Sequence, residues 1–252
     1  MKIGELLAST KSVPDEGLLT SSIPTPGNIM IADMAIVGDP PDTYECMERR
    51  PFHGANFKNF ARLCAAVGIP KYKLYLTNSI KAKLDRKSYK KAYTAKGYRC
   101  PDWGILQKRL IDELSAFPGK VIVLMGDFAM NLLLDDPRIN NLSKFRGSAY
   151  KAEQFQHLAE PLAGKIICIT YAPYDFSPRM KPANFYIAMN DLTKFAALKE
   201  EPELLDVEPN IITQPKFQEV MDFLYDVKAR TKLTSVDIEA TPKFVTCFAL
   251  TL

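Results

Sequence analysis

Four short runs of apolar residues, separated by polar segments, mark the first 200 residues of the chain. Each run is rich in Val, Ile and Leu and has the length of a buried strand. The runs cover residues 28–37, 74–80, 120–125 and 165–170. Apolar positions between the runs recur with helical spacing. These predicted helices cover residues 57–67, 104–117 and 127–134, and Gly68 is expected to end the first of them. The alternation predicts an α/β fold with three layers, α/β/α, around a mostly parallel four-stranded sheet.

The pattern changes after residue 199. Residues 200–215 contain three prolines and five acidic residues and are predicted to form a linker. Residues 216–229 follow as an amphipathic helix, and two alternating runs flanking Thr241 and Pro242 predict a hairpin. The predicted organisation is therefore a domain over 1–199, a linker over 200–215 and an incomplete domain over 216–252. The last piece is too small for a core of its own, so the natural protein is expected to continue past Leu252.

Charge is divided unevenly along the 252 residues. Residues 200–252 carry ten acidic and five basic side chains, whereas the first 199 residues carry 19 acidic and 28 basic ones. A basic front domain favours a polyanionic partner. No apolar run has the length of a membrane span and no signal peptide is evident, so a cytoplasmic protein without a membrane partner is expected. Five scattered cysteines without a CxxC pair argue against a disulfide framework and a zinc knuckle.

Ligands of parallel sheets bind at the carboxyl ends of the strands, which directs attention to the residues that follow each run. Gly38 and Asp39 follow the first run, and the pair is either a ligand-facing turn with a carboxylate or a plain turn. Phe52 is either a ring for stacking on a base or a core residue. Asn78 is a polar residue inside the second run, where its amide would read a pyrimidine edge or cap a loop.

A basic segment follows the second run directly. Residues 81–99 hold eight basic side chains and one acidic residue, with three tyrosines between them. Such a composition favours contact with the phosphates and bases of single-stranded DNA, and a solvated loop is the alternative. Arg146 and Arg179, near other strand ends, are expected to add phosphate contacts. The predicted DNA-binding residues are Lys81, Lys83, Arg86, Lys87, Lys90, Lys91, Arg146 and Arg179.

Six motifs in order make the first domain resemble the uracil-DNA glycosylase superfamily, in particular its family 4 and 5 enzymes. They read GDPP, RPFHG, YLTN, MGDFA, FRG and APYDFSPR, and the resemblance covers about residues 28–198. It implies that Asp39 assists the hydrolytic water, that Phe52 stacks on the flipped base and that Asn78 reads its edge. Ala172 stands where the family has the histidine that stabilises the developing oxyanion, so this catalytic group is lost.

The resemblance also bears on cofactors. Family 4 enzymes hold an iron–sulfur cluster with four cysteines, and the corresponding N-terminal positions of this chain have none. Cys100 is the one candidate ligand nearby, and one ligand does not hold a cluster. No iron–sulfur cluster is therefore expected.

A second resemblance concerns residues 211–252. Asp237 and Glu239 lie two residues apart on a predicted strand, so their side chains share a face, as metal-binding carboxylates do; two exposed acids on an edge strand are the alternative. The surrounding sequence resembles the start of a DnaQ-like 3′–5′ exonuclease domain of a phage-type family A DNA polymerase. This resemblance implies Mg²⁺ or Mn²⁺ for the complete exonuclease or polymerase only, and the host cytoplasm as the location.

The combined hypothesis is a glycosylase-fold module that binds DNA or senses bases, joined to a proofreading exonuclease at the start of a DNA polymerase. Its partners would be single-stranded or primer–template DNA and other replication proteins. The first alternative is an active glycosylase that removes uracil or a modified pyrimidine. The second is a nucleotide-binding protein without affinity for DNA. Loss of the histidine at Ala172 favours the binding module, because one oxyanion donor is worth roughly 10²–10³ in rate.

Overall fold

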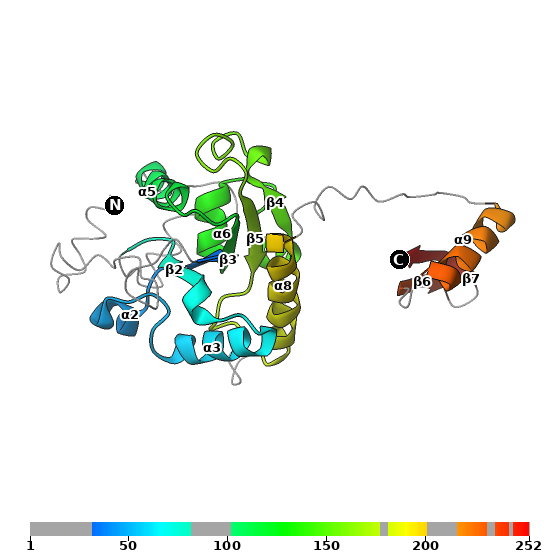
Figure 1. Ribbon diagram of the computed structural model, residues 1–252, viewed down its shortest axis with the longest axis horizontal. Coiled ribbons are helices and arrows are strands. Elements are labelled where there is room, and N and C mark those ends of the chain that lie inside the picture. The colour runs from blue at the N-terminus through cyan, green and yellow to red at the C-terminus, as the bar shows by residue number, and fades with distance from the viewer. Residues whose placement is uncertain are drawn as a thin grey trace. The chain divides into compact units, whose positions relative to one another are not determined.

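The computed structural model describes residues 32–81, 102–176, 181–200, 216–230, 235–241 and 244–251. The chain divides into two compact units, one within residues 1–206 and the other within residues 207–252 (Figure 1). The described strands are β1 (Met34–Gly38), β2 (Leu74–Asn78), β3 (Val121–Met125), β4 (Ala149–Lys151), β5 (Ile166–Thr170), β6 (Ser235–Thr241) and β7 (Phe244–Thr251). The described α-helices are α2 (Thr43–Glu48), α3 (Ala55–Val67), α5 (Trp103–Ser115), α6 (Asp127–Leu134), α7 (Leu142–Phe145), α8 (Ala183–Glu200) and α9 (Phe217–Arg230).

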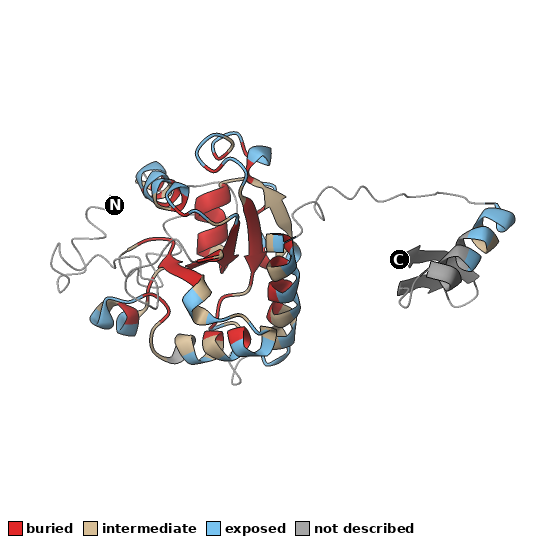
Figure 2. Cartoon of the chain, viewed as in Figure 1, coloured by how far each residue is buried: buried red, intermediate tan, exposed pale blue. Residues whose placement is uncertain are grey.

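The first unit is built on a five-stranded sheet with the order β2-β1-β3-β5-β4, as far as the chain is described. β1 pairs in parallel with β2 and β3, and β3 pairs in parallel with β5. All residues of these four strands are buried, as parallel strands covered on both faces require (Figure 2). The predicted α/β fold with a mostly parallel sheet is confirmed.

Helices cover both faces of this sheet and separate its core into two layers. Alternate residues of β1 and β3 face α3 and α8, where Phe60 and Phe195 are fully buried. The intervening residues face α5 and α6, where Leu114 and Phe128 are fully buried. The period of two along each strand therefore sorts the apolar side chains between the two layers.

Several predicted boundaries are corrected. β4 was not predicted, and it pairs antiparallel with β5 at the edge of the sheet, so the sheet has a fifth strand. α8 was also missed, and it extends through Glu200, the first residue assigned to the linker. α5 ends at Ser115 rather than at residue 117. Gly68 does end α3, in the left-handed conformation with φ of 75°.

The second unit contains α9 and an antiparallel hairpin of β6 and β7. The predicted helix and hairpin are both present, and the turn residues 242–243 lie outside the described residues. Among the helices that the structure describes, none combines the length and the apolar character needed to cross a membrane.

Candidate functional site

Polar and small residues converge where the parallel strands end. Gly38 at the end of β1 pairs with Asn78 at the end of β2 and with Met125 at the end of β3. Met125 in turn pairs with Thr170 at the end of β5. The segments that follow these strands, including Asp39, therefore start from one edge of the sheet, where parallel α/β folds bind ligands.

Gly38, Phe52 and Asn78 lie against one another at this edge. A Cβ on residue 38 would come within 3.0 Å of Cζ of Phe52 and 3.4 Å of Nδ2 of Asn78. Phe52 is 3% exposed and packs on Phe60, with 4.7 Å between ring centroids. The structure thus places Phe52 in the interior beside the candidate site, and base stacking by its ring stays a prediction.

Glu45, on α2, links these residues and was not singled out from the sequence. Its carboxylate accepts hydrogen bonds from the backbone N–H groups of Asp42, at 2.9 Å, and Phe52, at 2.5 Å. It also accepts a longer one, at 3.4 Å, from Nδ2 of Asn78. Burial raises the pKa of Glu45, against the lowering effect of these donors. The reciprocal bond from Glu45 N–H to Asp42 completes a capping box, and its spacing in DTYE is the signal that could have drawn attention to Glu45.

Asp39 is held at the start of α6. Its Oδ1 accepts a hydrogen bond of 3.0 Å from the backbone N–H of Ala129, in the first turn of that helix. Its carboxylate also lies directly over Gly126, where any Cβ would overlap with it. The amino-terminal end of a helix favours a negative charge, so the position suits an ionised carboxylate.

The segment after β5 contains Ala172, which is buried and offers only a methyl group to its surroundings. Its N–H donates to Oδ2 of Asp175 at 3.1 Å, and the carbonyl of Pro173 accepts from Asn59 at 3.2 Å. Burial raises the pKa of Asp175. A cleft of about 310 Å³ lies beside this segment, lined in part by Asp127 and Asp175.

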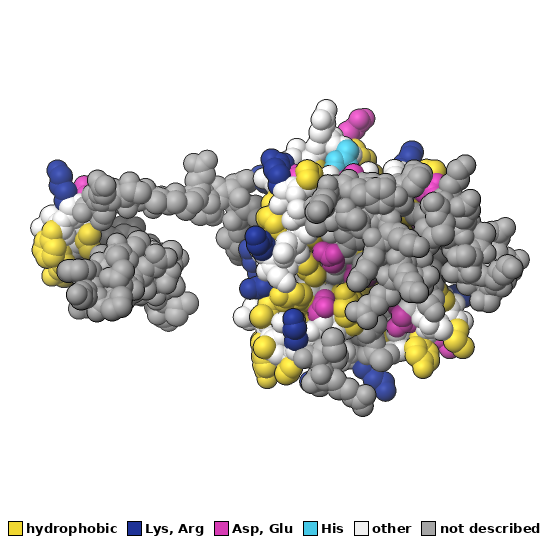
Figure 3. All heavy atoms as spheres, turned by 180° about the vertical axis from the view of Figure 1, so that it is seen from behind, with side chains coloured by type: hydrophobic (Ala, Val, Ile, Leu, Met, Phe, Trp, Pro, Cys, Tyr) yellow, Lys and Arg dark blue, Asp and Glu magenta, His cyan; other side chains and the backbone are white. Residues whose placement is uncertain are grey.

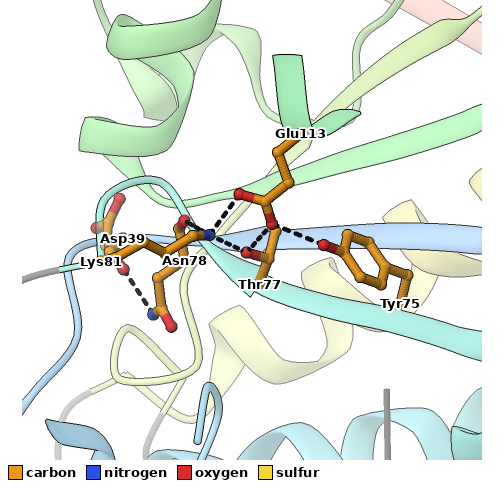
Figure 4. A network of polar contacts seen from close by, with 6 residues as sticks. All are labelled: Asp39, Tyr75, Thr77, Asn78, Lys81 and Glu113. Carbon is orange, nitrogen blue, oxygen red and sulfur yellow. Dashed lines mark hydrogen bonds and ion pairs between the residues drawn. The ribbon is translucent and has the colours of Figure 1, made fainter. Parts of the chain in front are cut away.

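Lys81 lies just after β2, and its ammonium is bound inside the domain (Figure 4). It forms an ion pair of 2.7 Å with Glu113 on α5 and donates to the Asn78 carbonyl at 3.0 Å and to the Thr77 hydroxyl. Glu113 also accepts from Thr77 and from the hydroxyl of Tyr75. Burial lowers the pKa of Lys81, and Glu113 opposes this effect. The three N–H groups are used internally, which leaves none for the predicted phosphate contact in this arrangement.

Arg146 is also engaged inside the domain. Its guanidinium forms an ion pair of 3.2 Å with Asp191 on α8, whose second oxygen accepts from Thr170 at 2.8 Å. Asp191 is 5% exposed, and burial raises its pKa despite both partners. The Arg146 side chain keeps about a third of its surface exposed, so its predicted phosphate contact stays a prediction.

The remaining predicted DNA contacts lie outside the described residues, namely Lys83, Arg86, Lys87, Lys90, Lys91 and Arg179. On the face of the first unit seen in Figure 3, described Lys and Arg side chains are scattered among acidic ones rather than gathered in one patch. Asp237 and Glu239 lie two residues apart on β6, opposite Ala249 and Cys247 of β7, so the backbone places them on one face. Their side chains are not described.

A metal ion or a cluster needs several ligands close together. Within the described residues, no three His, Cys, Asp or Glu side chains are arranged to hold a metal ion. Cys64 and Cys168 are buried thiols in the core, and burial raises the pKa of Cys64 to about 12. Iron–sulfur ligands are thiolates, so these two cysteines do not fit a cluster. Cys100 lies outside the described residues.

Comparison with known proteins agrees with this arrangement. The chain is 26% identical over 138 residues to the type-4 uracil-DNA glycosylase of Archaeoglobus fulgidus, a match that covers 54% of this chain and 65% of that relative. The chain therefore spans less than two thirds of the relative's length. Residues 25–193 match the family described as the uracil DNA glycosylase superfamily. This match covers more than half of the chain, which therefore belongs to the uracil DNA glycosylase superfamily.

Proposed function

We propose that the first unit is a DNA-binding module that recognises an extruded pyrimidine base and excises it slowly or not at all. The observation that carries this proposal is the assembly of Gly38, Asp39 and Asn78 at the carboxyl edge of a glycosylase-family sheet. A glycine allows close approach of a ligand, and a buried amide reads a base edge. Membership of the uracil DNA glycosylase superfamily supports DNA as the partner.

Ala172 is the reason for weak or absent excision. Glycosidic cleavage leaves negative charge on the departing base, and a side-chain donor at this position would stabilise it. The Ala172 methyl cannot donate, and its own N–H is already bound to Asp175. The loss of one such donor lowers the rate by roughly 10²–10³.

An excision assay tests the proposal. The protein is incubated with single-stranded and duplex oligonucleotides that carry one uracil, and binding is followed on the same samples. We expect uracil-dependent binding without appreciable release of uracil, and faster release in the variant Ala172→His. Asn190→Ala, an exposed change on α8, is the control that should alter neither readout. Rapid excision by the unchanged protein would refute the loss of catalysis.

An active glycosylase is the second candidate. Asp39 favours it, because its carboxylate is retained and held at the start of α6, where it could orient a water molecule. The relative from Archaeoglobus fulgidus also carries that activity in its name. In this case excision should depend on Asp39, and Asp39→Asn should reduce the single-turnover rate at least tenfold more than it reduces binding.

For the second unit we propose the start of a 3′–5′ exonuclease domain in a phage-type DNA polymerase. The support is the order of α9, β6 and β7 together with Asp237 and Glu239 on one face of β6. If this proposal holds, the complete protein should shorten DNA from the 3′ end when Mg²⁺ or Mn²⁺ is present. Asp237→Ala should abolish that activity and leave uracil-dependent binding unchanged. Degradation that does not need a metal ion, or no degradation at all, would overturn the proposal for the second unit.

A further inference from the structure

A second cleft lies at the end of the sheet opposite the candidate site. β1 and β2 pair in register from Met34 with Leu74 to Gly38 with Asn78, and the candidate site is at the latter pair. The cleft has a volume of about 290 Å³, and its lining includes Met34 and Leu74 at the former pair. Four residue steps along β1 separate the two pairs, a distance of about 13 Å. A ligand in this cleft would therefore leave the candidate site open.

Aliphatic side chains form part of the lining of this cleft. Val67 is the last residue of α3, Ile69 follows that helix, and Ala196 lies near the end of α8. These three side chains pack on the core layer between the sheet and the two helices, but they are only partly buried. Apolar surface that remains exposed in a cleft favours a ligand that covers it.

Two lysines share one carboxylate oxygen in the same lining. Nζ of Lys73 and Nζ of Lys199 each lie 3.3 Å from Oδ2 of Asp33. The backbone N–H of Asp33 donates to the carbonyl of Lys73 at 2.9 Å, which fixes the carboxylate beside the start of β2. Lys199 also pairs with Glu200, an exposed residue outside the lining. The charged residues that line the cleft therefore carry two positive charges and one negative charge.

The two ammonium groups retain donors for a further anion. An ammonium carries three N–H groups. Among the described residues, the ionic partner of Lys73 is Asp33, and those of Lys199 are Asp33 and Glu200. Both lysine side chains are partly exposed, so a ligand can reach them. The cleft thus offers cationic donors beside aliphatic surface.

This lining suits a peptide better than DNA or a drug-sized molecule. A DNA strand would bring its phosphates against the Asp33 carboxylate, and its bases would find no aromatic ring among the described lining residues. Small-molecule sites have volumes of about 300–1,000 Å³, so this cleft is at the lower end of that range. Its size is sufficient for a few side chains of a peptide.

We propose that the cleft binds an acidic peptide segment of a partner protein. A carboxylate of the peptide pairs with Lys73 and Lys199, and a neighbouring aliphatic side chain covers Val67, Ile69 and Ala196. Charge complementarity selects this partner, because two cations in the lining face one anion of the protein itself. The site is independent of the proposed base-binding function, and it would hold a partner protein while DNA occupies the opposite end of the sheet.

Titration of the full chain with labelled peptides tests the proposal. The probe is the synthetic peptide GSELDLEGS, and its matched partners are GSQLNLQGS, without the acidic residues, and GSESDSEGS, without the leucines. Fluorescence polarisation should show saturable binding of the probe, at least about tenfold tighter than that of either partner. Added salt should weaken this binding, because the contact is partly ionic. The absence of saturable binding up to about 1 mM, or equal binding of all three peptides, would overturn the proposal.

Variants locate the binding in the cleft. Lys73→Gln and Lys199→Gln should each lower the affinity for the probe about fivefold, whereas Asp33→Asn should raise it several-fold because it removes the competing carboxylate. The three side chains are partly exposed, so these changes should cost little stability. Lys71→Gln is the matched control, because Nζ of Lys71 lies 4.4 Å from the centroid of the Phe57 ring and outside the lining. Unchanged probe affinity in all three cleft variants would overturn the proposal.

Two other occupants are distinguished with the same samples. Displacement of the probe by an unlabelled single strand without uracil would identify the cleft as a DNA surface. A concentration-dependent dimer that Lys73→Gln dissociates would identify a second copy of the chain as the occupant. Either result would overturn the proposal. Uracil-dependent DNA binding should be the same in Lys73→Gln and in the unchanged protein, so a failed peptide titration would leave the proposed function standing.

Discussion

The backbone of Gly126 lies directly beneath the carboxylate of Asp39, so that a Cβ on residue 126 would overlap with both carboxylate oxygens. Gly126 also has φ of 118°, a backbone conformation that residues other than glycine rarely adopt. It is the N-cap residue immediately before α6, and Asp39 binds the first turn of that helix. Two segments 90 residues apart are thus joined at the candidate site.

Gly126→Ala should therefore displace Asp39 as well as strain the backbone. We expect a loss of about 2–4 kcal/mol in the free energy of unfolding, measured by urea denaturation. Gly68→Ala is the matched control, because Gly68 also has positive φ but open space around it. That control should cost about 1–2 kcal/mol, the backbone term alone. Equal losses in the two variants would contradict the close contact with Asp39.

Glu113→Gln tests the buried ion pair with Lys81. Removal of the negative charge leaves a buried ammonium with weaker partners, at a cost of about 3 kcal/mol at pH 7. Burial already lowers the pKa of Lys81. The unfolded chain therefore binds the Lys81 proton more tightly than the folded protein does. As a result, the free energy of unfolding rises with pH between the folded-state pKa of Lys81 and 10.5. The deficit of the variant should shrink between pH 7 and pH 10.

The control for this prediction lies on the same helix. Asp112 pairs with Lys108 at 2.7 Å, but both side chains are more than half exposed. Asp112→Asn should change the free energy of unfolding by less than about 1 kcal/mol. Equal effects of the two variants would contradict the proposed difference in burial.

Asp191→Asn tests the buried carboxylate that joins Arg146 and Thr170. Its pKa is raised by burial, so the folded state binds the proton more tightly than the unfolded chain. The contribution of Asp191 to stability is then full below pH 3.8 and decreases as the pH rises through the folded-state pKa. Relative to the unchanged protein, the variant should gain stability between pH 4 and pH 7, measured by urea denaturation at fixed ionic strength. A constant difference would argue against the raised pKa.

The basic segment should control the salt dependence of DNA binding. Replacing Lys87, Lys90 and Lys91 by Gln removes three cationic side chains, and each lost phosphate contact lowers the slope of log K against log salt by about 0.7 for single strands. Lys120→Gln, immediately before β3 at the opposite edge of the sheet, should leave the slope unchanged. A slope unaffected by the triple change would identify the segment as a solvated loop.

Much of the fold could be predicted because local pattern and tertiary environment agree. β1, β3 and β5 are continuous apolar runs, which only a sheet covered on both faces can bury. β4 has three half-buried residues and therefore no recognisable period. In α8 the buried positions include Asp191, and this charged residue interrupts the apolar pattern that would predict the helix from the sequence.

At the site, the sequence by itself determined which residue types stand at the strand ends. Gly38 and Asn78 end apolar strands and Asp39 follows one, and parallel pairing brings strand ends to one edge. Only the tertiary structure decided which hydrogen-bond partners those side chains have. The Asn78 donors are used by Asp39 and Glu45, and the Lys81 ammonium by Glu113, through contacts between residues 32 to 39 positions apart. Hydrogen-bond partners of this kind depend on distance in space, which no local pattern of residues encodes.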